Sequence, residues 1–195
     1  MKFDLTKIQP DVRKLSDMRE VIFDKEWLKS ADNAELYFMY RGLENNGELR
    51  YDITVIPAKM LGKEFNKTKG HFHIGKFQEV YTVIEGNAIY LMQKKNGEGK
   101  IEDTYFVEAK KGDSIIIPPF YGHITINPSE TNSLKMANWI SENCKSDYSF
   151  FVEKQGACYY YTKEGWIKNE NYKNVPELRS EEPLSSLPEN LDFLK

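Results

Sequence analysis

The segment Thr68-Lys-Gly-His-Phe-His-Ile-Gly-Lys-Phe-Gln-Glu-Val-Tyr81 holds two of the chain's three histidines, His71 and His73. Side chains two residues apart in a β-strand point to the same face of the sheet. Glu79 follows His73 after five intervening residues. A lone His-x-His pair is usually an ordinary surface or core feature, so this segment needs support from the rest of the chain before it indicates a site.

That support comes from the third histidine, His123, which ends the run Pro118-Pro-Phe-Tyr-Gly-His123. No other histidine occurs in the chain. Three neutral imidazoles and one carboxylate suit a divalent transition metal, with coordination positions left open for a substrate. The pattern therefore indicates that His71, His73, Glu79 and His123 act together.

The composition is that of a single domain, or of one domain with extensions, because the chain has 195 residues. Hydrophobic residues make up 40% and aromatic residues 13% of the chain, which favours a sheet with aromatic walls around a pocket. The formal net charge is −3, with acidic and basic residues interspersed. We therefore expect neither a nucleic-acid partner nor a membrane surface as partner.

The start of the chain has no apolar run of the kind found in signal peptides, and no stretch is long enough for a transmembrane helix. We expect a cytoplasmic protein. Cys144 and Cys158 are then free thiols in a reducing compartment, and neither lies in a Cys-x-x-Cys motif.

Short strand-like runs separated by turn signals indicate an all-β sandwich or barrel. The run Leu49–Ile56 alternates, with Leu49 and its apolar partners on one face and Arg50, Asp52 and Thr54 on the other. Turn signals such as Asn96-Gly97 separate the runs. The predicted strands cover residues 35–40, 49–56, 79–85, 88–93, 102–107, 114–117, 123–127, 134–140, 148–153 and 157–162.

Three parts follow from these patterns. Residues 1–33 form an N-terminal arm with a short helix over Asp24–Lys29, which we expect to pack on the barrel or on a partner subunit. Residues 34–168 form the barrel. Residues 169–195 form a proline-rich, partly ordered tail. Exposed strand edges and aromatic faces favour pairing, so we expect a homodimer with the arm at its interface.

The segment from His71 to Gly86 resembles the first motif of the cupins, G(x)5HxH(x)3–4E(x)6G, through His71, His73, Glu79 and Gly86. The loop before Glu79 has one residue more than the usual upper limit. Cupins are small double-stranded β-helix (jelly-roll) barrels, so the resemblance implies that fold.

The segment from Gly112 to Asn127 resembles the second cupin motif, G(x)5PxG(x)2H(x)3N, through Gly112, Pro118, His123 and Asn127. Phe120 stands where the motif has its second glycine, so we expect a tighter or shifted turn. In cupins the four ligands of the two motifs converge on a metal inside the barrel.

Within the cupins, Thr-Lys-Gly-His-Phe-His followed by Glu-Val-Tyr is similar to the cupin-type glucose-6-phosphate isomerases of archaea and some bacteria. The resemblance extends to Arg13–Met18, Gly62–Phe65, Pro118-Pro119 and Asp147-Tyr148. It implies one divalent metal ion per subunit, Fe²⁺ in the cell with Mn²⁺, Ni²⁺ or Zn²⁺ as alternatives, and a small phosphorylated sugar as partner. The implied site residues are the metal ligands His71, His73, Glu79 and His123, the phosphate-binding Thr54, Thr68 and Gly70, and the catalytic Glu79 and Tyr81.

The chain also departs from this family. Phe120 stands where relatives have tyrosine, an aromatic position near Trp139 is tyrosine in relatives, and Ser146 replaces a histidine. The loop between His73 and Glu79, often six residues in the family, has five here. Proton-shuttle roles assigned to those positions therefore do not carry over.

The residues fit the implied reaction on chemical grounds. Aldose–ketose isomerisation moves a proton between C1 and C2, which needs a base and stabilised enediolate oxygens, and a metal beside a carboxylate can supply both. Threonine hydroxyls and the Gly70 N–H would bind a phosphate, and Lys69 is a further candidate as a point charge. Thr54 and Thr68 could equally be ordinary β-branched strand residues, and the Lys69 side chain can point outward.

Two other functions use similar features. The same 3-His-1-carboxylate set supports O₂ chemistry with Fe(II), so a dioxygenase or a different sugar isomerase or epimerase is an alternative. A non-catalytic sugar-binding cupin is the second alternative. Sensors of that kind usually carry a fused DNA-binding domain, and the sequence has no helix-turn-helix pattern or basic patch.

Overall fold

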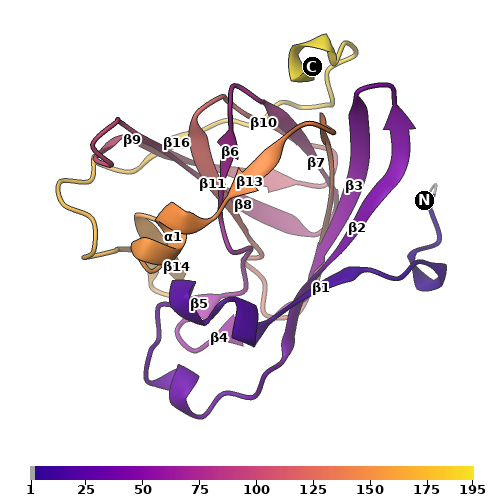
Figure 1. Cartoon of the computed structure of the whole chain (residues 1–195). Helices are drawn as coiled ribbons and strands as arrows, with labels where there is room; N and C mark the ends of the chain where they lie inside the picture. The colour runs from indigo at the N-terminus through magenta and orange to yellow at the C-terminus, as the bar shows by residue number, and fades with distance from the viewer. Residues whose placement is uncertain (1–2) are drawn as a thin grey trace.

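Two facing sheets enclose the interior of the protein in the computed structural model, which describes residues 3–195. The larger has the strand order β1-β2-β3-β12-β7-β10, and the smaller β11-β8-β9-β16 (Figure 1). The strands of the larger sheet, in that order, are Asp11–Lys14, Glu35–Asn46, Leu49–Ile56, Leu134–Ser141, Glu79–Glu85 and Ser114–Ile117. Those of the smaller are Tyr121–Ile126, Asn87–Lys95, Ile101–Lys110 and Arg179–Glu181. This is the predicted all-β cupin barrel.

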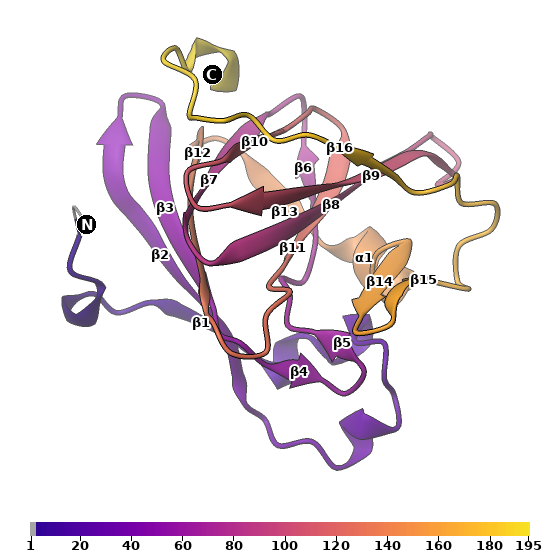
Figure 2. The ribbon, with the colours of Figure 1, turned by 180° about the vertical axis from the view of Figure 1, so that it is seen from behind.

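Two small sheets complete the barrel. One pairs β6 (Phe72–Ile74) with β13 (Lys145–Asp147). The other has the order β15-β14-β5-β4, with bounds Gly165–Lys168, Tyr159–Thr162, Glu64–Phe65 and Met60–Leu61. Figure 2 shows the C-terminal segment running along the smaller main sheet, where β16 pairs with β9 in parallel.

The polar face of β3 turns inward. Arg50, Asp52 and Thr54 line a cavity inside the barrel. On the other face of the sheet, Leu49 packs in a second small apolar cluster with Val80 and the C-terminal Leu194. The end of the tail therefore covers apolar surface that would otherwise meet water.

The helical N-terminal arm that we predicted is not observed. The segment contains β1, which pairs with β2, and single 3₁₀ turns at Leu5–Lys7, Leu15–Asp17, Arg19–Val21 and Trp27–Lys29. A helix this short cannot recover the cost of nucleation, so tertiary contacts decide the backbone. The apolar residues of the arm are buried in the main core, namely Leu15, Met18, Val21, Ile22 and Leu28.

The strand that we predicted over residues 148–153 is also wrong, because Ser149–Glu153 forms the α-helix α1. The Ser149 N–H donates to the Asp147 carboxylate at 2.9 Å at the start of this helix. Phe150 and Phe151 are adjacent in sequence, and both are buried. A short aromatic run has no clear periodicity, so its sequence does not distinguish strand from helix. Within residues 3–195 no helix is long and apolar enough to cross a membrane.

A buried ion pair ties the arm to the barrel. Lys67 Nζ lies 2.6 Å from Glu64 Oε2 and donates to the Val21 carbonyl at 2.9 Å. The second carboxylate oxygen of Glu64 accepts the Phe23 N–H at 2.7 Å. Both side chains are almost fully buried. Each charge thus depends on the other for its stability in a medium of low polarity.

Lys67→Met should lower the free energy of unfolding by about 3–5 kcal/mol, because it leaves the Glu64 carboxyl buried without its cation. Urea unfolding followed by circular dichroism measures the change. The double variant Lys67→Met/Glu64→Gln removes both charges and keeps an acceptor for Phe23, so it should regain most of the loss. A double variant as unstable as the single one would contradict this account.

Phe120 adopts the backbone conformation of the glycine that it replaces. Its φ is 68°, in the left-handed region, and its side chain is 49% exposed. The turn before β11 therefore holds Phe120 in a conformation that favours glycine. A left-handed conformation costs a residue with a Cβ atom about 1–3 kcal/mol.

Phe120→Gly should raise the free energy of unfolding by about 1 kcal/mol, because the relieved strain exceeds the added chain entropy of glycine. The expected gain in melting temperature is about 2–4 °C. Phe120→Ala is the matched control, because it removes the ring but keeps the Cβ atom. An equal gain in both variants would assign the effect to the exposed ring instead.

Candidate metal centre and its cavity

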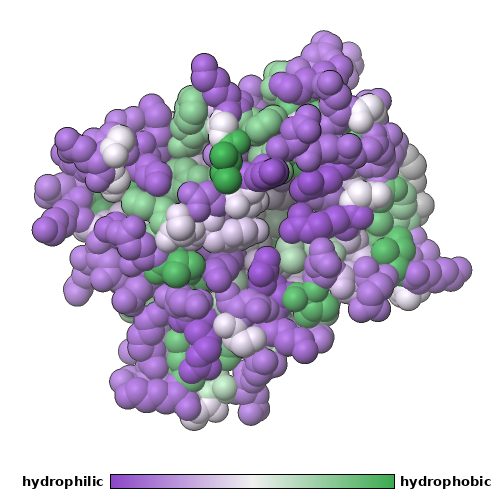
Figure 3. Space-filling model, in the orientation of Figure 1, coloured by the Kyte–Doolittle hydropathy of each residue, from purple (hydrophilic) through white to green (hydrophobic). Residues whose placement is uncertain are grey.

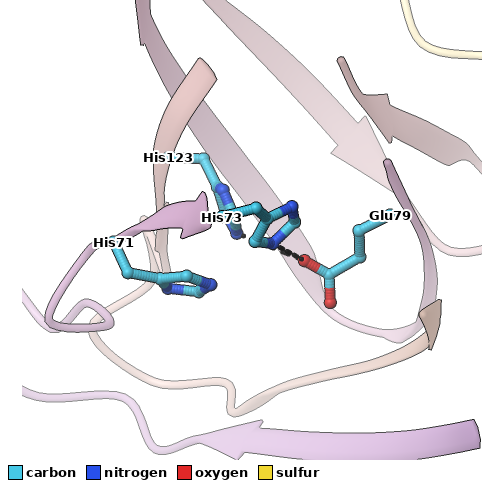
Figure 4. A group of neighbouring side chains, drawn as sticks. All are labelled: His71, His73, Glu79 and His123. Carbon is cyan, nitrogen blue, oxygen red and sulfur yellow. Dashed lines mark ion pairs between the residues drawn. The ribbon is translucent and has the colours of Figure 1, made fainter. Parts of the chain in front are cut away.

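The four candidate ligands come from both sides of the barrel. His73 lies in β6, Glu79 begins β7 and His123 lies in β11. His71 precedes β6 and forms an isolated bridge with His123, through N–H donation in both directions at 3.3 and 3.0 Å. The four side chains point toward one another (Figure 4), and their ligand atoms all lie within 4.8 Å of one another.

The polar atoms of this group fit a cation. His73 Nε2, Glu79 Oε2 and both ring nitrogens of His123 are buried without a hydrogen-bond partner in the described chain. Glu79 Oε2 lies 3.3 Å from His73 Nε2 and 3.4 Å from His123 Nε2. Unpartnered buried polar atoms destabilise a fold, and a divalent ion would satisfy His73 Nε2, Glu79 Oε2 and one ring nitrogen of His123 together.

The loop between β6 and β7 sets the orientation of His73. His73 Nδ1 lies 3.2 Å from the Phe77 carbonyl oxygen, which can only accept, so Nδ1 carries the proton. Nε2 is therefore the nitrogen that faces Glu79 and is available to a metal. A hydrogen bond to the far nitrogen is the usual way in which proteins orient a ligating histidine.

The surroundings of His71, His123 and Glu79 favour the deprotonated state of each side chain, which is the state that binds a metal. Burial lowers the pKa of His71 well below its usual value and also lowers that of His123. Burial would raise the pKa of the Glu79 carboxyl, but the adjacent His123 and His73 lower it. For His73, burial is outweighed by the neighbouring Cys144 thiol and Glu79 carboxylate, which raise its pKa to about 10. A cation therefore displaces a proton from this ring on binding.

A cavity opens beside the four ligands, between β13 and β3 on the face shown in Figure 3. The cavity is open to solvent at its mouth. The wall of the cavity includes three of the candidate metal ligands, His71, Glu79 and His123. It also includes all the candidate substrate residues, namely Thr54, Thr68, Gly70 and Tyr81.

The wall at Thr68 and Gly70 is fixed by close contacts. Thr68 Oγ1 accepts the Thr125 N–H at 2.9 Å, so its own hydroxyl hydrogen is left to donate. Gly70 has a φ of +84°, and a Cβ atom there would lie 2.5 Å from the Ile124 side chain. Lys69 Nζ instead donates to the Asp17 carbonyl at 2.7 Å, in the arm.

Several wall residues were not identified from the sequence. Asn138 lies in β12, and its Nδ2 donates to Glu79 Oε1 at 2.6 Å. The alternation of β3 placed Arg50 and Asp52 on one face of the strand, but it did not show that this face points into the cavity. Tyr148 places its ring 5.4 Å from that of His71. The wall residues missed by the sequence reasoning are Tyr37, Met39, Arg41, Arg50, Asp52, Met136, Asn138, Ile140, Ser146 and Tyr148.

The positions at which the chain departs from its relatives divide between cavity and surface. Ser146 lines the cavity. Trp139 packs instead in the cluster on the outer face of the sheet, and the next residue, Ile140, lines the cavity. Phe120 is not part of the wall.

The sequence was then compared with known proteins. A sequence profile described as Glucose-6-phosphate isomerase (GPI) matches residues 12–177. The chain belongs to the glucose-6-phosphate isomerase family. The family's enzyme from Thermococcus litoralis is 32% identical over 150 residues, covering 73% of this chain and 75% of that one. The enzyme of the same name from Pyrococcus horikoshii is 30% identical over 172 residues, covering 84% and 88%.

Among solved structures, an oxalate oxidase in complex with the substrate analogue glycolate matches with a TM-score of 0.46 and 14% sequence identity. The match covers 61% of this chain and 57% of that chain. Membership of the glucose-6-phosphate isomerase family rests on the sequence matches.

His123→Ala should reduce bound metal several-fold or more, because it removes a ligand from the β11 side of the centre. Elemental analysis after gel filtration measures occupancy, and circular dichroism checks that the barrel remains folded. Tyr121→Phe in the same strand is the control and should keep its metal. Full occupancy in folded His123→Ala would contradict the assignment.

Proposed function

We propose that this protein interconverts glucose 6-phosphate and fructose 6-phosphate as a metal-dependent aldose–ketose isomerase. The observation that carries the proposal is that one cavity holds both a four-residue metal group and a cluster of phosphate-type donors. The family supplies the substrate class. The cavity has an open mouth through which a small sugar can enter.

The phosphate occupies the end of the cavity near Thr54, Thr68 and Gly70. The Thr68 hydroxyl is oriented to donate by the bond that its oxygen accepts from Thr125. The backbone N–H of Gly70, which lines the same end of the cavity, is the further donor in this proposal. Lys69 does not act as the phosphate cation, since its ammonium group is bound in the arm.

The reacting carbons lie next to Glu79 and Tyr81. The Glu79 carboxylate takes a proton from C1 of fructose 6-phosphate and returns it to C2, as a positioned base. Burial, followed by the charge of Glu79, raises the pKa of Tyr81 well above its usual value. Tyr81 is therefore a neutral phenol that donates a hydrogen bond to a substrate oxygen. A bound divalent ion would stabilise the negative charge that develops on the enediolate oxygens.

The natural metal, the cellular location and the assembly are part of the same proposal. Fe²⁺ is the proposed metal in the cell, with Mn²⁺, Ni²⁺ and Zn²⁺ able to occupy the same ligand set. The protein acts in the cytoplasm on its phosphorylated sugar. We also propose a homodimer, for which light scattering at micromolar concentration should give twice the mass of one chain.

A coupled assay on fructose 6-phosphate, with metal removed by a chelator and then added back, tests the reaction. Glu79→Gln keeps the size of the side chain but removes the base, so kcat should fall by roughly 10²–10⁴. The KM should change little, because the phosphate contacts remain. Metal content must be measured on the same preparation of this variant.

A metal-loaded Glu79→Gln protein with near wild-type kcat would overturn the base assignment. If Glu79 moves a proton, glucose 6-phosphate formed in D₂O should contain deuterium at C2. Activity that persists without O₂ separates the isomerase from a dioxygenase. A protein that binds fructose 6-phosphate without turnover would support the sugar-binding alternative instead.

Thr54→Val tests the phosphate end separately, because valine keeps the shape of the side chain and removes its hydroxyl. The KM for fructose 6-phosphate should rise by about 5–30-fold, the effect of losing a hydrogen bond of about 1–2 kcal/mol to a charged group. The kcat should stay within about threefold. A fall in kcat at constant KM would argue against phosphate binding by Thr54.

A further inference from the structure

Asn138 donates a hydrogen bond to the Glu79 carboxylate. Its Nδ2 lies 2.6 Å from Glu79 Oε1, and the residue is only 4% exposed. The other carboxylate oxygen, Oε2, faces the nitrogens of His73 and His123. The two oxygens of Glu79 thus have different neighbours.

The backbone holds Asn138 rigidly in this place. It lies in β12, which pairs on one side with β3 and on the other with β7. Its register partners are Asp52 and Tyr81, and Glu79 is the partner of Ile140, two residues further along the same face. A residue in the centre of a six-stranded sheet has little backbone freedom. Its side chain therefore meets Glu79 at a fixed diagonal position.

The chemistry sets which end of the amide faces Glu79. A carboxylate that ligates a metal is deprotonated and can only accept hydrogen bonds. The amide nitrogen of Asn138 must therefore face Oε1, as observed. With Oε1 occupied in this way, Oε2 is the oxygen directed toward His73 and His123.

We propose that Asn138 is a positioning residue that holds Glu79 as a one-oxygen ligand. The donated hydrogen bond keeps Oε1 away from the metal and prevents the carboxylate from rotating into a two-oxygen binding mode. A coordination position thereby stays open for substrate oxygens. The effect on turnover rests on the proposed isomerase function, whereas the effect on the metal's coordination does not.

Asn138→Leu removes the donor and keeps the approximate volume, and Asn138→Ala provides a second variant should leucine disturb the packing. Without the amide, Oε1 is free to join Oε2 on the metal and to raise its coordination number. Trp139→Phe is the matched control. It alters the same strand at the next position, on the face that packs away from the cavity.

The experiment loads each full-length protein with Co²⁺, which reports coordination number through the position and intensity of its visible absorption. Elemental analysis gives the metal content, circular dichroism gives the melting temperature, and a coupled assay gives kcat and KM for fructose 6-phosphate. The Asn138 variants should remain loaded and show an altered Co²⁺ spectrum. Their kcat should fall by about 10–100-fold, with KM within about threefold, as for other partners that orient metal ligands.

Trp139→Phe should keep the wild-type spectrum and kcat. A wild-type Co²⁺ spectrum in both folded Asn138 variants would overturn the proposal, even if their activity or melting temperature fell, because a purely structural role leaves coordination unchanged. Loss of metal from both variants would also overturn it. The two proposals can also fail separately. If the wild-type protein does not convert fructose 6-phosphate but the Asn138 variants show an altered Co²⁺ spectrum, the positioning role is supported and the isomerase function is refuted.

Discussion

The convergence of three imidazoles and one carboxylate inside an apolar barrel is the constraint on which the rest of this structure depends. Buried polar atoms without partners are costly, and here they are concentrated in one place. The surrounding structure holds them in register. The His71–His123 bridge joins two strand segments, the Phe77 carbonyl orients His73, and Asn138 orients Glu79. A single cation would then convert several unfavourable contacts into favourable ones.

The cavity has a second consequence for the fold. A strand that directs its polar face inward must bury its apolar face on the outside of the sheet. The C-terminal residues Leu191 and Leu194 pack over that outer face, and the ring of Phe3 lies 6.0 Å from Tyr51. The terminal segments thus cover apolar surface on the outside of the larger sheet.

The arm contributes at the other end of the site. The Lys67–Glu64 pair binds its backbone at Val21 and Phe23, and Lys69 binds it at Asp17. All three contacts flank the segment that leads to Gly70 and His71. The arm therefore supports the wall assigned to phosphate, although its local sequence predicted helix instead of the 3₁₀ turns and strand that form.

The sequence by itself determined most strands of the two main sheets, several turns between them and the four candidate metal ligands, because these depend on residue type and short-range spacing. It also gave the alternation of β3, but not which face is inside. Only the tertiary structure decided that Arg50, Asp52 and Asn138 face the cavity, and that Trp139 does not. It also decided that residues 149–153 form a helix and that Lys69 points into the arm. The physical reason is that alternation and propensity are local, whereas the direction of a polar face depends on what covers the opposite one. Here segments far away in sequence cover it.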